Sequence, residues 1–335
     1  MNEKKSILIV RLSALGDVAM TVPAVYSLAE RYPELEICVL TRPFFAQLFV
    51  NRRQNVRIVE ADLGGRHKGV RGMFRLLRLL SSYNFDCVAD FHNVLRSWII
   101  DVFFVLCGKR VVMVDKQRRM RRKVLSGGGE QMNFVDRYVR VLERLGYPLE
   151  LTFRSVFQCH MPELPAVVRH PAVGIAPFAR YKNKTYPLSQ MKKAAEILAG
   201  MGVSVYLFGG RGKEAEELGR WQNEIGGCVS FAGKCTMADE LAIMSGLDVM
   251  ITMDSANQHL ASLAGVKVLS VWGSTTPSCG FLGYGQSKDS LICLNLPCQP
   301  CTIAGSDECR LRSFECMVGI EPEDIVQKVK SMIKF

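Results

Sequence analysis

The sequence predicts an α/β protein built from two doubly wound, Rossmann-like domains. Short, continuous apolar runs recur along the 335 residues, and each run is followed by a turn and then by a helical pattern. Such runs, alternating with helices, are typical of parallel sheets that are covered on both faces. A proline-rich stretch at 159–173 without clear periodicity separates the two sets of runs. We therefore predict one domain over 1–165 and a second over 166–320.

The expected strands are short and rich in large or β-branched apolar residues. The first is ILIV at 7–10, which leads into a turn of small residues. The others lie at 36–40, 86–89, 110–114, 173–176, 203–208, 248–252 and 267–272. A last segment, 321–335, has Pro322 in its opening turn, with acids first and lysines later, which predicts an amphipathic terminal helix. Its apolar stripe must be buried against one of the domains.

The composition indicates a globular protein with a substantial core, because 48% of the residues are hydrophobic and 22% are charged. No apolar run approaches the roughly 18 to 20 residues that a membrane span needs. The N-terminal residues MNEKKS lead into a strand rather than into the apolar stretch of a signal peptide. We expect a cytoplasmic location.

The formal net charge is +11, and much of the excess lies in 66–80 and 115–125. Such a balance favours anionic partners, which include nucleic acids, phosphorylated ligands and anionic membrane surfaces. The pattern MFRLLRLL at 73–80 fits an interfacial helix and, equally, a core helix with a charged outer face. The run KQRRMRRK at 116–123 is predicted to be an exposed loop that grips a phosphorylated saccharide or lipid head groups. Its candidate ligands are Arg118, Arg119, Arg121 and Arg122.

The turn after the first expected strand, RLSALGD, carries a single acid, Asp17. Ser13 and Gly16 keep this turn small, so that its backbone can approach a ligand. The turn has neither the glycines of the dinucleotide fingerprint nor the Gly-Lys-Ser/Thr of a P-loop. Taken alone, Asp17 fits an acid that interacts with the helix dipole better than it fits a general base for a bound hydroxyl.

Two regions in the second half are suited to a phosphorylated ligand. The strand expected at 248–252 leads into a helix whose first backbone N–H groups are free to hold phosphate. A further loop carries Arg180, Lys182 and Lys184, and three cations there suit a diphosphate, although solvated lysines are the simple alternative. The candidate donor ligands are Lys184, Asp254, Ser255, Ala256, Asn257, His259, Ser274 and Thr275.

Four of the twelve cysteines crowd near the C-terminus, namely Cys298, Cys301, Cys309 and Cys316. Their spacing, C-x2-C-x7-C-x6-C, is compatible with a four-cysteine structural zinc site. Packed thiols are the alternative, and neither interpretation gives the cysteines a part in catalysis.

These motifs together resemble glycosyltransferase family 9, the bacterial lipopolysaccharide ADP-heptose heptosyltransferases. The resemblance rests on ILIVRLSALGDVAMTVPAV at 7–25, KNKTYP at 182–187, the long segment 231–277 and the C-terminal cysteines. The LGD turn, combined with D-S-x-x-x-H-L-A and G-S-T-x-P far downstream, is specific as a set, whereas each motif alone is not.

The resemblance implies a GT-B architecture, in which two Rossmann-like domains face each other across a cleft. The donor nucleotide sugar would bind mostly to the C-terminal domain and the acceptor to the N-terminal one, with 321–335 packing back toward the N-terminal domain. The implied activity is inverting transfer of heptose from ADP-heptose without a catalytic metal or other cofactor. The implied partners are a lipid-linked saccharide acceptor and an anionic surface at the inner face of the cytoplasmic membrane.

Residue by residue, Asp17 matches the catalytic acid of the family, and Lys184 matches the lysine that neutralises the donor diphosphate. DSANQH at 254–259 matches the donor motif D-[ST]-G-x-x-H, with Ala256 in place of glycine. Ala179 and Arg180 stand where hydroxyl residues are frequent in the family, and Arg211 lies near a position that holds an acid in some members. These departures leave the donor's sugar and base open. The sequence also does not specify the acceptor, the linkage position or the oligomeric state.

A protein of another class remains as the alternative, namely a non-enzymatic α/β protein that binds nucleic acid through its basic patches. Those patches lack interleaved stacking aromatics, and no known nucleic-acid module is present, so that nucleic acid is not the expected partner. A dinucleotide-dependent oxidoreductase is disfavoured because the glycine fingerprint is missing.

Overall fold

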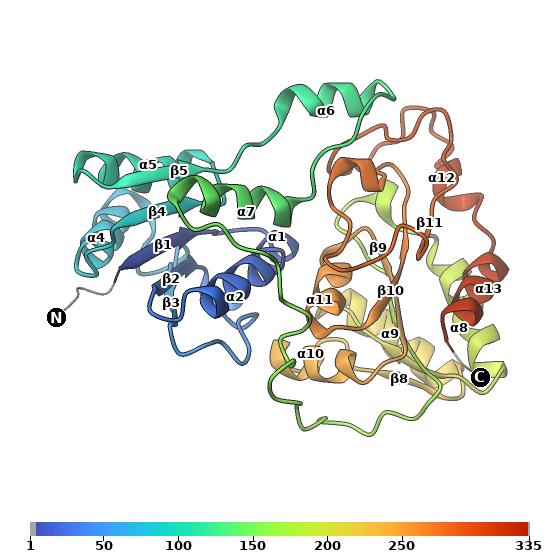
Figure 1. Cartoon of the computed structure of the whole chain (residues 1–335). Helices are drawn as coiled ribbons and strands as arrows, with labels where there is room; N and C mark the ends of the chain where they lie inside the picture. The colour runs from blue at the N-terminus through green and yellow to red at the C-terminus, as the bar shows by residue number, and fades with distance from the viewer. Residues whose placement is uncertain (1–4, 334–335) are drawn as a thin grey trace. The chain divides into compact units, whose positions relative to one another are not determined.

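The computed structural model describes residues 5–333, which form two compact units, each with its own parallel sheet (Figure 1). The two sheets confirm the predicted α/β class. Unit 1 comprises the chain up to Lys116 together with Phe134–Val156, and unit 2 comprises Gln117–Asn133 and the chain from Phe157 onward. The chain thus passes into unit 2 between Val156 and Phe157 rather than at 165. The segment Gln117–Asn133, expected in the first domain, belongs to unit 2.

Unit 1 has a five-stranded sheet in the order β3-β2-β1-β4-β5. Its strands are β1 Ser6–Val10, β2 Glu36–Thr41, β3 Val56–Glu60, β4 Cys87–Asp90 and β5 Arg110–Met113. Its helices are α1 Leu15–Ala19, α2 Thr21–Arg31, α3 Pro43–Ala46, α4 Gly69–Ser81, α5 Leu95–Leu106 and α7 Phe134–Leu145. The sequence analysis missed β3, because an edge strand is partly exposed and its sequence VRIVE alternates instead of forming a continuous apolar run.

Unit 2 has a six-stranded sheet in the order β11-β10-β9-β6-β7-β8. Its strands are β6 Ala172–Ala176, β7 Ser204–Leu207, β8 Cys228–Ser230, β9 Val249–Met253, β10 Lys267–Val271 and β11 Leu291–Ile292. Its helices are α6 Arg118–Leu125, α8 Leu188–Gly200, α9 Lys213–Glu224, α10 Met237–Ser245, α11 Ala256–Ala264, α12 Glu315–Val318 and α13 Pro322–Met332, with 3₁₀ helices η1 Lys182–Lys184 and η2 Pro277–Cys279. The short strands β8 and β11 at the two sheet edges were not predicted.

The terminal helix is present as predicted, and it packs within unit 2. Its apolar side chains, Ile325, Val326 and Val329, are buried in the core of unit 2, where α13 lies against α8 and β10. The Tyr186 hydroxyl, just before α8, donates a 2.7 Å hydrogen bond to the Ile320 carbonyl and so holds the start of α13 beside that helix. This tether and the fit of the apolar stripe on α8 fix α13 within unit 2.

The basic run expected to be a loop is the helix α6. Arginine, methionine and lysine are good helix formers, and Val124 gives the helix one buried contact while most of its basic side chains face solvent. The segment that follows α6 is fixed to the loop around η2, because Gln131 N donates to the Ser278 carbonyl at 2.8 Å and Asn133 Nδ2 donates to the Leu282 carbonyl at 2.8 Å. The four α6 arginines therefore belong to unit 2.

The pattern MFRLLRLL forms part of α4, whose leucines pack into the core and whose arginines lie on the outer face. Met73, Leu76, Leu77 and Leu80 are buried against the sheet, whereas the arginines are exposed. Between Lys5 and Ile333, no helix has both the length and the apolar character needed to cross a bilayer.

Candidate active site

Both sheets have a point at which the strand order reverses, between β1 and β4 in unit 1 and between β6 and β9 in unit 2. In open parallel sheets, ligands bind at such points, beyond the carboxyl ends of the strands. The three principal candidates lie in the segments that follow these strands: Asp17 comes after β1, Lys184 after β6 and Asp254 after β9. The topology thus places the predicted residues where this fold binds ligands.

In unit 1, the Asp17 carboxylate is held by two contacts at the start of α1. Its Oδ2 accepts a 3.1 Å hydrogen bond from the Ala14 backbone N–H and forms a 2.7 Å ion pair with Arg11 Nη2. Arg11 is buried, and its Nη1 donates to the Phe91 carbonyl at 2.6 Å. The Asp17 side chain is 25% exposed, so the carboxylate is both fixed in position and accessible from solvent.

The second strand at this point brings His92 to the turn, a residue that sequence reasoning missed. His92 Nε2 lies 3.2 Å from Ser13 Oγ, and the His92 backbone N–H donates to Asp90 Oδ1 at 2.7 Å. Burial and the nearby Arg11 charge lower the pKa of His92 to about 4, so its imidazole is neutral near pH 7. His92 lies in the loop just beyond the strand expected at 86–89, and this position is the signal that could have identified it. Gly16 lies in α1, one residue before Asp17.

Two acids are buried behind this turn. Asp90, at the end of β4, accepts hydrogen bonds from the Asn93 backbone N–H at 2.9 Å and from Ser97 Oγ at 2.7 Å. Asp101 lies on the buried side of α5, and burial together with the neighbouring Asp90 carboxylate raises the pKa of Asp101 to about 8. Asp101 is therefore largely protonated at neutral pH.

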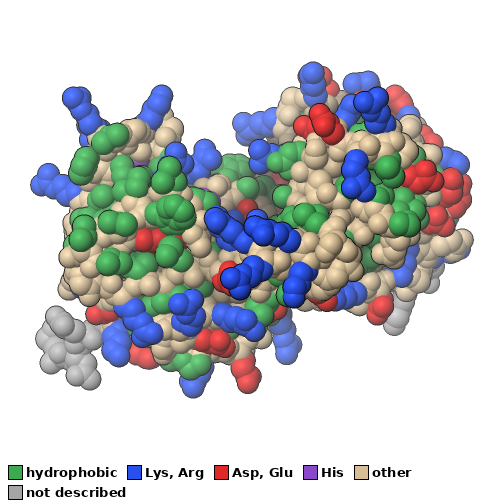
Figure 2. Space-filling view, turned by 90° about the horizontal axis from the view of Figure 1, so that it is seen from above, with side chains coloured by type: hydrophobic (Ala, Val, Ile, Leu, Met, Phe, Trp, Pro, Cys, Tyr) green, Lys and Arg blue, Asp and Glu red, His purple; other side chains and the backbone are tan. Residues whose placement is uncertain are grey.

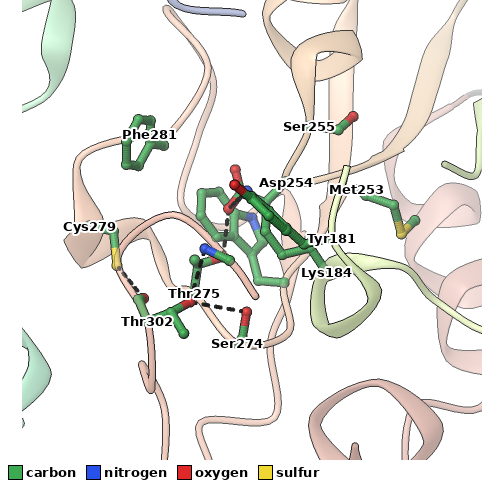
Figure 3. A network of polar contacts seen from close by, with 12 residues as sticks. Tyr181, Lys184, Met253, Asp254, Ser255, Ser274, Thr275, Cys279, Phe281 and Thr302 are labelled. Carbon is green, nitrogen blue, oxygen red and sulfur yellow. Dashed lines mark hydrogen bonds and ion pairs between the residues drawn. The ribbon is translucent and has the colours of Figure 1, made fainter. Parts of the chain in front are cut away.

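In unit 2, Lys184 and Asp254 form the centre of the polar network shown in Figure 3. Lys184 Nζ lies 2.7 Å from Asp254 Oδ2, and Thr275 Oγ1 donates to the same oxygen at 2.5 Å. Gln258 Nε2 donates to Asp254 Oδ1 at 3.0 Å. Both carboxylate oxygens are therefore occupied by groups of the protein, and Asp254 is buried beneath Lys184.

The start of α11 forms a second part of this region. Ser255 is the N-cap residue, and its Oγ accepts a hydrogen bond from the Asn257 backbone N–H at 3.4 Å. Ala256 and Asn257 are half-exposed, whereas His259 is buried on the first turn of the helix. The positive end of the helix dipole and its first N–H groups are suited to a phosphate.

Ser274 and Thr275 are buried and connect the loops of the site. The Ser274 backbone N–H donates to the Asn183 carbonyl at 3.0 Å, and Thr302 Oγ1 donates to Ser274 Oγ at 3.4 Å (Figure 3). Ser274 thus joins the Lys184 segment to the loop at 302–308, while Thr275 contacts Asp254.

The loop at 302–308 is a part of the site that the sequence analysis missed. Asn183 Nδ2 donates to the Glu308 carbonyl at 3.2 Å, and Asn183 Oδ1 accepts from the Ser306 backbone N–H at 2.9 Å. Gly305 has φ +103°, and a Cβ there would lie 2.6 Å from Lys184 Cδ. A glycine is therefore needed where this loop packs on the lysine, a contact that no local sequence pattern indicates.

The four candidate zinc ligands interact electrostatically with one another, but the described residues show no metal site there. Cys301 Sγ lies 3.7 Å from the Ser274 carbonyl oxygen, and Cys316 is buried in the core of unit 2, where burial raises the pKa of its thiol to about 12. Cys298 and Cys309 are half-buried, and all four thiols are free. Within 5–333, no three His, Cys, Asp or Glu side chains are placed so that they could hold a metal ion.

Comparison with known families decides the class of this protein. The profile of glycosyltransferase family 9 (heptosyltransferase) matches residues 73–311, which is more than half of the chain. The chain belongs to glycosyltransferase family 9. This membership confirms the predicted family and the predicted enzyme class over the nucleic-acid-binding alternative.

Curated relatives of this family 9 chain match it over nearly its whole length. Lipooligosaccharide heptosyltransferase 2 of Campylobacter jejuni is 23% identical, over 96% of each chain. Lipopolysaccharide heptosyltransferase 1 of Pseudomonas aeruginosa is 24% identical, over 98% of each chain.

Solved structures of the family confirm the predicted GT-B fold. A family 9 glycosyl transferase from Veillonella parvula superposes with a TM-score of 0.73 at 17% identity, covering 99% of this chain and 98% of the other. The Escherichia coli heptosyltransferase WaaC with ADP gives a TM-score of 0.71 at 18% identity, covering 98% of this chain and 100% of the other. At these identities the likeness shows the fold alone.

Proposed function

We propose that this family 9 enzyme transfers heptose from ADP-heptose to a lipid-linked saccharide of the lipopolysaccharide core, with inversion at the anomeric carbon. The observation that carries the proposal is the Lys184–Asp254 pair at the reversal point of the unit 2 sheet, 2.7 Å apart. The names of the curated relatives, which are lipooligosaccharide and lipopolysaccharide heptosyltransferases, support this choice of substrates.

In the proposed donor site, Lys184 Nζ and the first N–H groups of α11 neutralise the diphosphate of the nucleotide sugar. Asp254 is a positioning residue, because its oxygens are already occupied by Lys184, Thr275 and Gln258. The small or polar residues at the start of α11 let the diphosphate approach the backbone, and two hydroxyl residues in the loop after β10 hold the loops around it. These residues are Ser255, Ala256, Asn257, His259, Ser274 and Thr275.

In the proposed reaction, the acceptor hydroxyl oxygen attacks the anomeric carbon while the bond from that carbon to the diphosphate oxygen breaks. The Asp17 carboxylate takes the hydroxyl proton, and ADP leaves with the electron pair. Ser13 and Gly16 shape the turn beside Asp17, and the α6 arginines Arg118, Arg119, Arg121 and Arg122 supply charge for a phosphorylated acceptor. Lys184 and the helix start supply the positive charge at the leaving group, which supports transfer without a metal ion.

The direct test is incubation of the purified protein with ADP-heptose and a core saccharide that lacks its heptose. We expect a single new glycosidic linkage, with the anomeric configuration opposite to that of the donor when the product is analysed by NMR. Retained configuration, or turnover with another nucleotide sugar but none with ADP-heptose, would contradict the proposal. Activity that is lost in EDTA and restored by magnesium would contradict the metal-independent mechanism.

A further inference from the structure

Helix α5 presents a continuous apolar stripe to solvent. Residues separated by three and four positions along a helix share one face, and here that face is exposed instead of buried. Its members are Leu95, 74% exposed, Trp98, 42%, Ile99, 44%, Val102, 57%, Val105, 57%, and Leu106, 82%. Figure 2 shows hydrophobic side chains gathered on the side of unit 1 where α5 lies, with Lys and Arg side chains at the margin.

Helix α4 extends this surface and adds positive charge to it. Buried residues of α4 and α5, among them Leu76 and Ile100, join one core cluster, so the two helices cover the same face of the unit 1 sheet. On its outer side, α4 exposes Val70 and Phe74 together with three arginines. These arginines are Arg71, Arg75 and Arg78.

Acidic side chains are scarce on this outer surface. Helix α4 contains no Asp or Glu, and the single acid of α5, Asp101, is only 4% exposed. Figure 2 shows an acidic side chain among the hydrophobic ones on this side of unit 1, so the surface is apolar and cationic apart from that group. Exposed apolar groups of this extent are unfavourable in water and indicate a partner that covers them.

We propose that the outer faces of α4 and α5 bind the surface of a bilayer that contains anionic lipids. Helices that lie in the membrane interface combine Trp, Phe and Leu with basic residues, and the arginines then meet the lipid phosphates. A second copy of this chain fits the surface less well, because the same face of the copy carries the same excess of cations and offers the arginines few opposite charges. Charge complementarity thus selects the anionic membrane.

Helix α5 begins close to a residue that contacts the turn carrying Asp17. Helix α5 begins at Leu95, three residues after His92, which contacts Ser13 in that turn. Association of α5 with lipid would therefore hold the turn close to a lipid-linked acceptor. This link to the acceptor rests on the proposed function, whereas lipid binding by α5 does not.

The tryptophans provide a direct test, because Trp221 and Trp272 are only 1% and 0% exposed whereas Trp98 lies in the stripe. The full-length protein is mixed with vesicles of phosphatidylcholine containing brominated acyl chains, with or without about 30% phosphatidylglycerol. We expect quenching of tryptophan emission by the anionic vesicles and little quenching by the neutral ones. A Trp98→Phe variant should lose the quenched component while it still sediments with the vesicles.

Two sets of variants test the apolar and the charged parts separately. Val102→Gln/Leu106→Gln should reduce the vesicle partition coefficient roughly tenfold or more. The matched control Met161→Gln/Val167→Gln alters side chains that are 72% and 81% exposed in unit 2, and it should bind like the wild type. Arg71→Gln/Arg75→Gln/Arg78→Gln should abolish the preference for anionic lipid. Circular dichroism verifies that each variant is folded.

Three results would overturn the proposal. They are absence of quenching by anionic vesicles, equal quenching by neutral vesicles, and a concentration-dependent dimer that the α5 variant dissociates. Transfer to a lipid-free acceptor is measured in parallel. If the wild type binds vesicles but transfers no heptose from ADP-heptose, the proposed function fails and the membrane surface stands.

Discussion

The reversal points of the two sheets each hold one acid–base ion pair, but the pairs are oriented in opposite ways. In unit 1, the cation of the pair, Arg11, is the buried partner, with a side chain 7% exposed against 25% for Asp17. In unit 2, the acid is the buried partner, with 4% for Asp254 against 12% for Lys184. Both pairs have an N–O distance of 2.7 Å. The more exposed partner is therefore the anion in unit 1 and the cation in unit 2.

This difference matches the chemistry proposed for each unit. An accessible carboxylate can accept a proton from a hydroxyl, and an accessible ammonium can neutralise a diphosphate. The buried partner holds the outer group in place, so it acts through its neighbour and not on the substrate. Burial, more than residue type, decides which member of an ion pair can act on a ligand.

The largest expected effect is on the exposed anion of unit 1. Asp17→Asn keeps the shape of the side chain but removes its basicity, so we expect transfer to fall by about 10³-fold. Donor affinity, measured by calorimetry with ADP-heptose, should stay within about twofold of the wild type, because the donor contacts are proposed to lie in unit 2. Turnover within tenfold of the wild type would remove Asp17 from the role of base.

A smaller effect is expected from the cation of unit 2. Lys184→Ala should weaken donor binding by roughly 10- to 100-fold, because a charge-assisted contact with the diphosphate is lost. Lys193→Ala is the matched control, since Lys193 pairs with Glu323 at the surface of α8. Titration calorimetry with ADP-heptose gives both affinities, and equal affinity for the two variants would contradict the donor role of Lys184.

The smallest expected effect on activity concerns Asp101, a buried acid that forms no ion pair within 5–333. The folded protein retains the Asp101 proton up to about pH 8, whereas the unfolded chain releases it near its ordinary pKa of about 4. The unfolded state binds fewer protons between these values, so the contribution of Asp101 to stability falls as pH rises from about 4 to about 8.

Asp101→Asn removes this pH dependence. We expect the variant to be more stable than the wild type at pH 8, by up to about 5 kcal/mol, with the difference disappearing near pH 4. Urea unfolding at the two pH values measures the change, and Asp289→Asn, at an exposed site, is the control. Transfer activity should be unchanged, and a stability gain of equal size at both pH values would show that Asp101 is not protonated in the folded state.

Local patterns were sufficient for part of the fold. Continuous apolar runs predicted the central strands, because that signal depends on neighbouring residues alone, whereas Asp17, Lys184 and Asp254 became candidates through the family motifs. The short edge strands β3, β8 and β11 were missed, since a strand with one open side needs no continuous apolar run. The support of Lys184 by Asn183 and Gly305 was missed because it joins segments more than 100 residues apart.

By itself, the sequence determined the α/β class, the family and the chemical groups at the strand ends. Tertiary structure alone decided which side of each group is covered. Helices α4 and α5 both carry many apolar residues, yet α4 turns its leucines into the core and α5 turns much of its apolar surface to solvent. Likewise, only packing shows that Arg11 and Asp254 are the inner partners of their pairs. The reason is that burial depends on contacts between segments distant in the chain, which local composition does not specify.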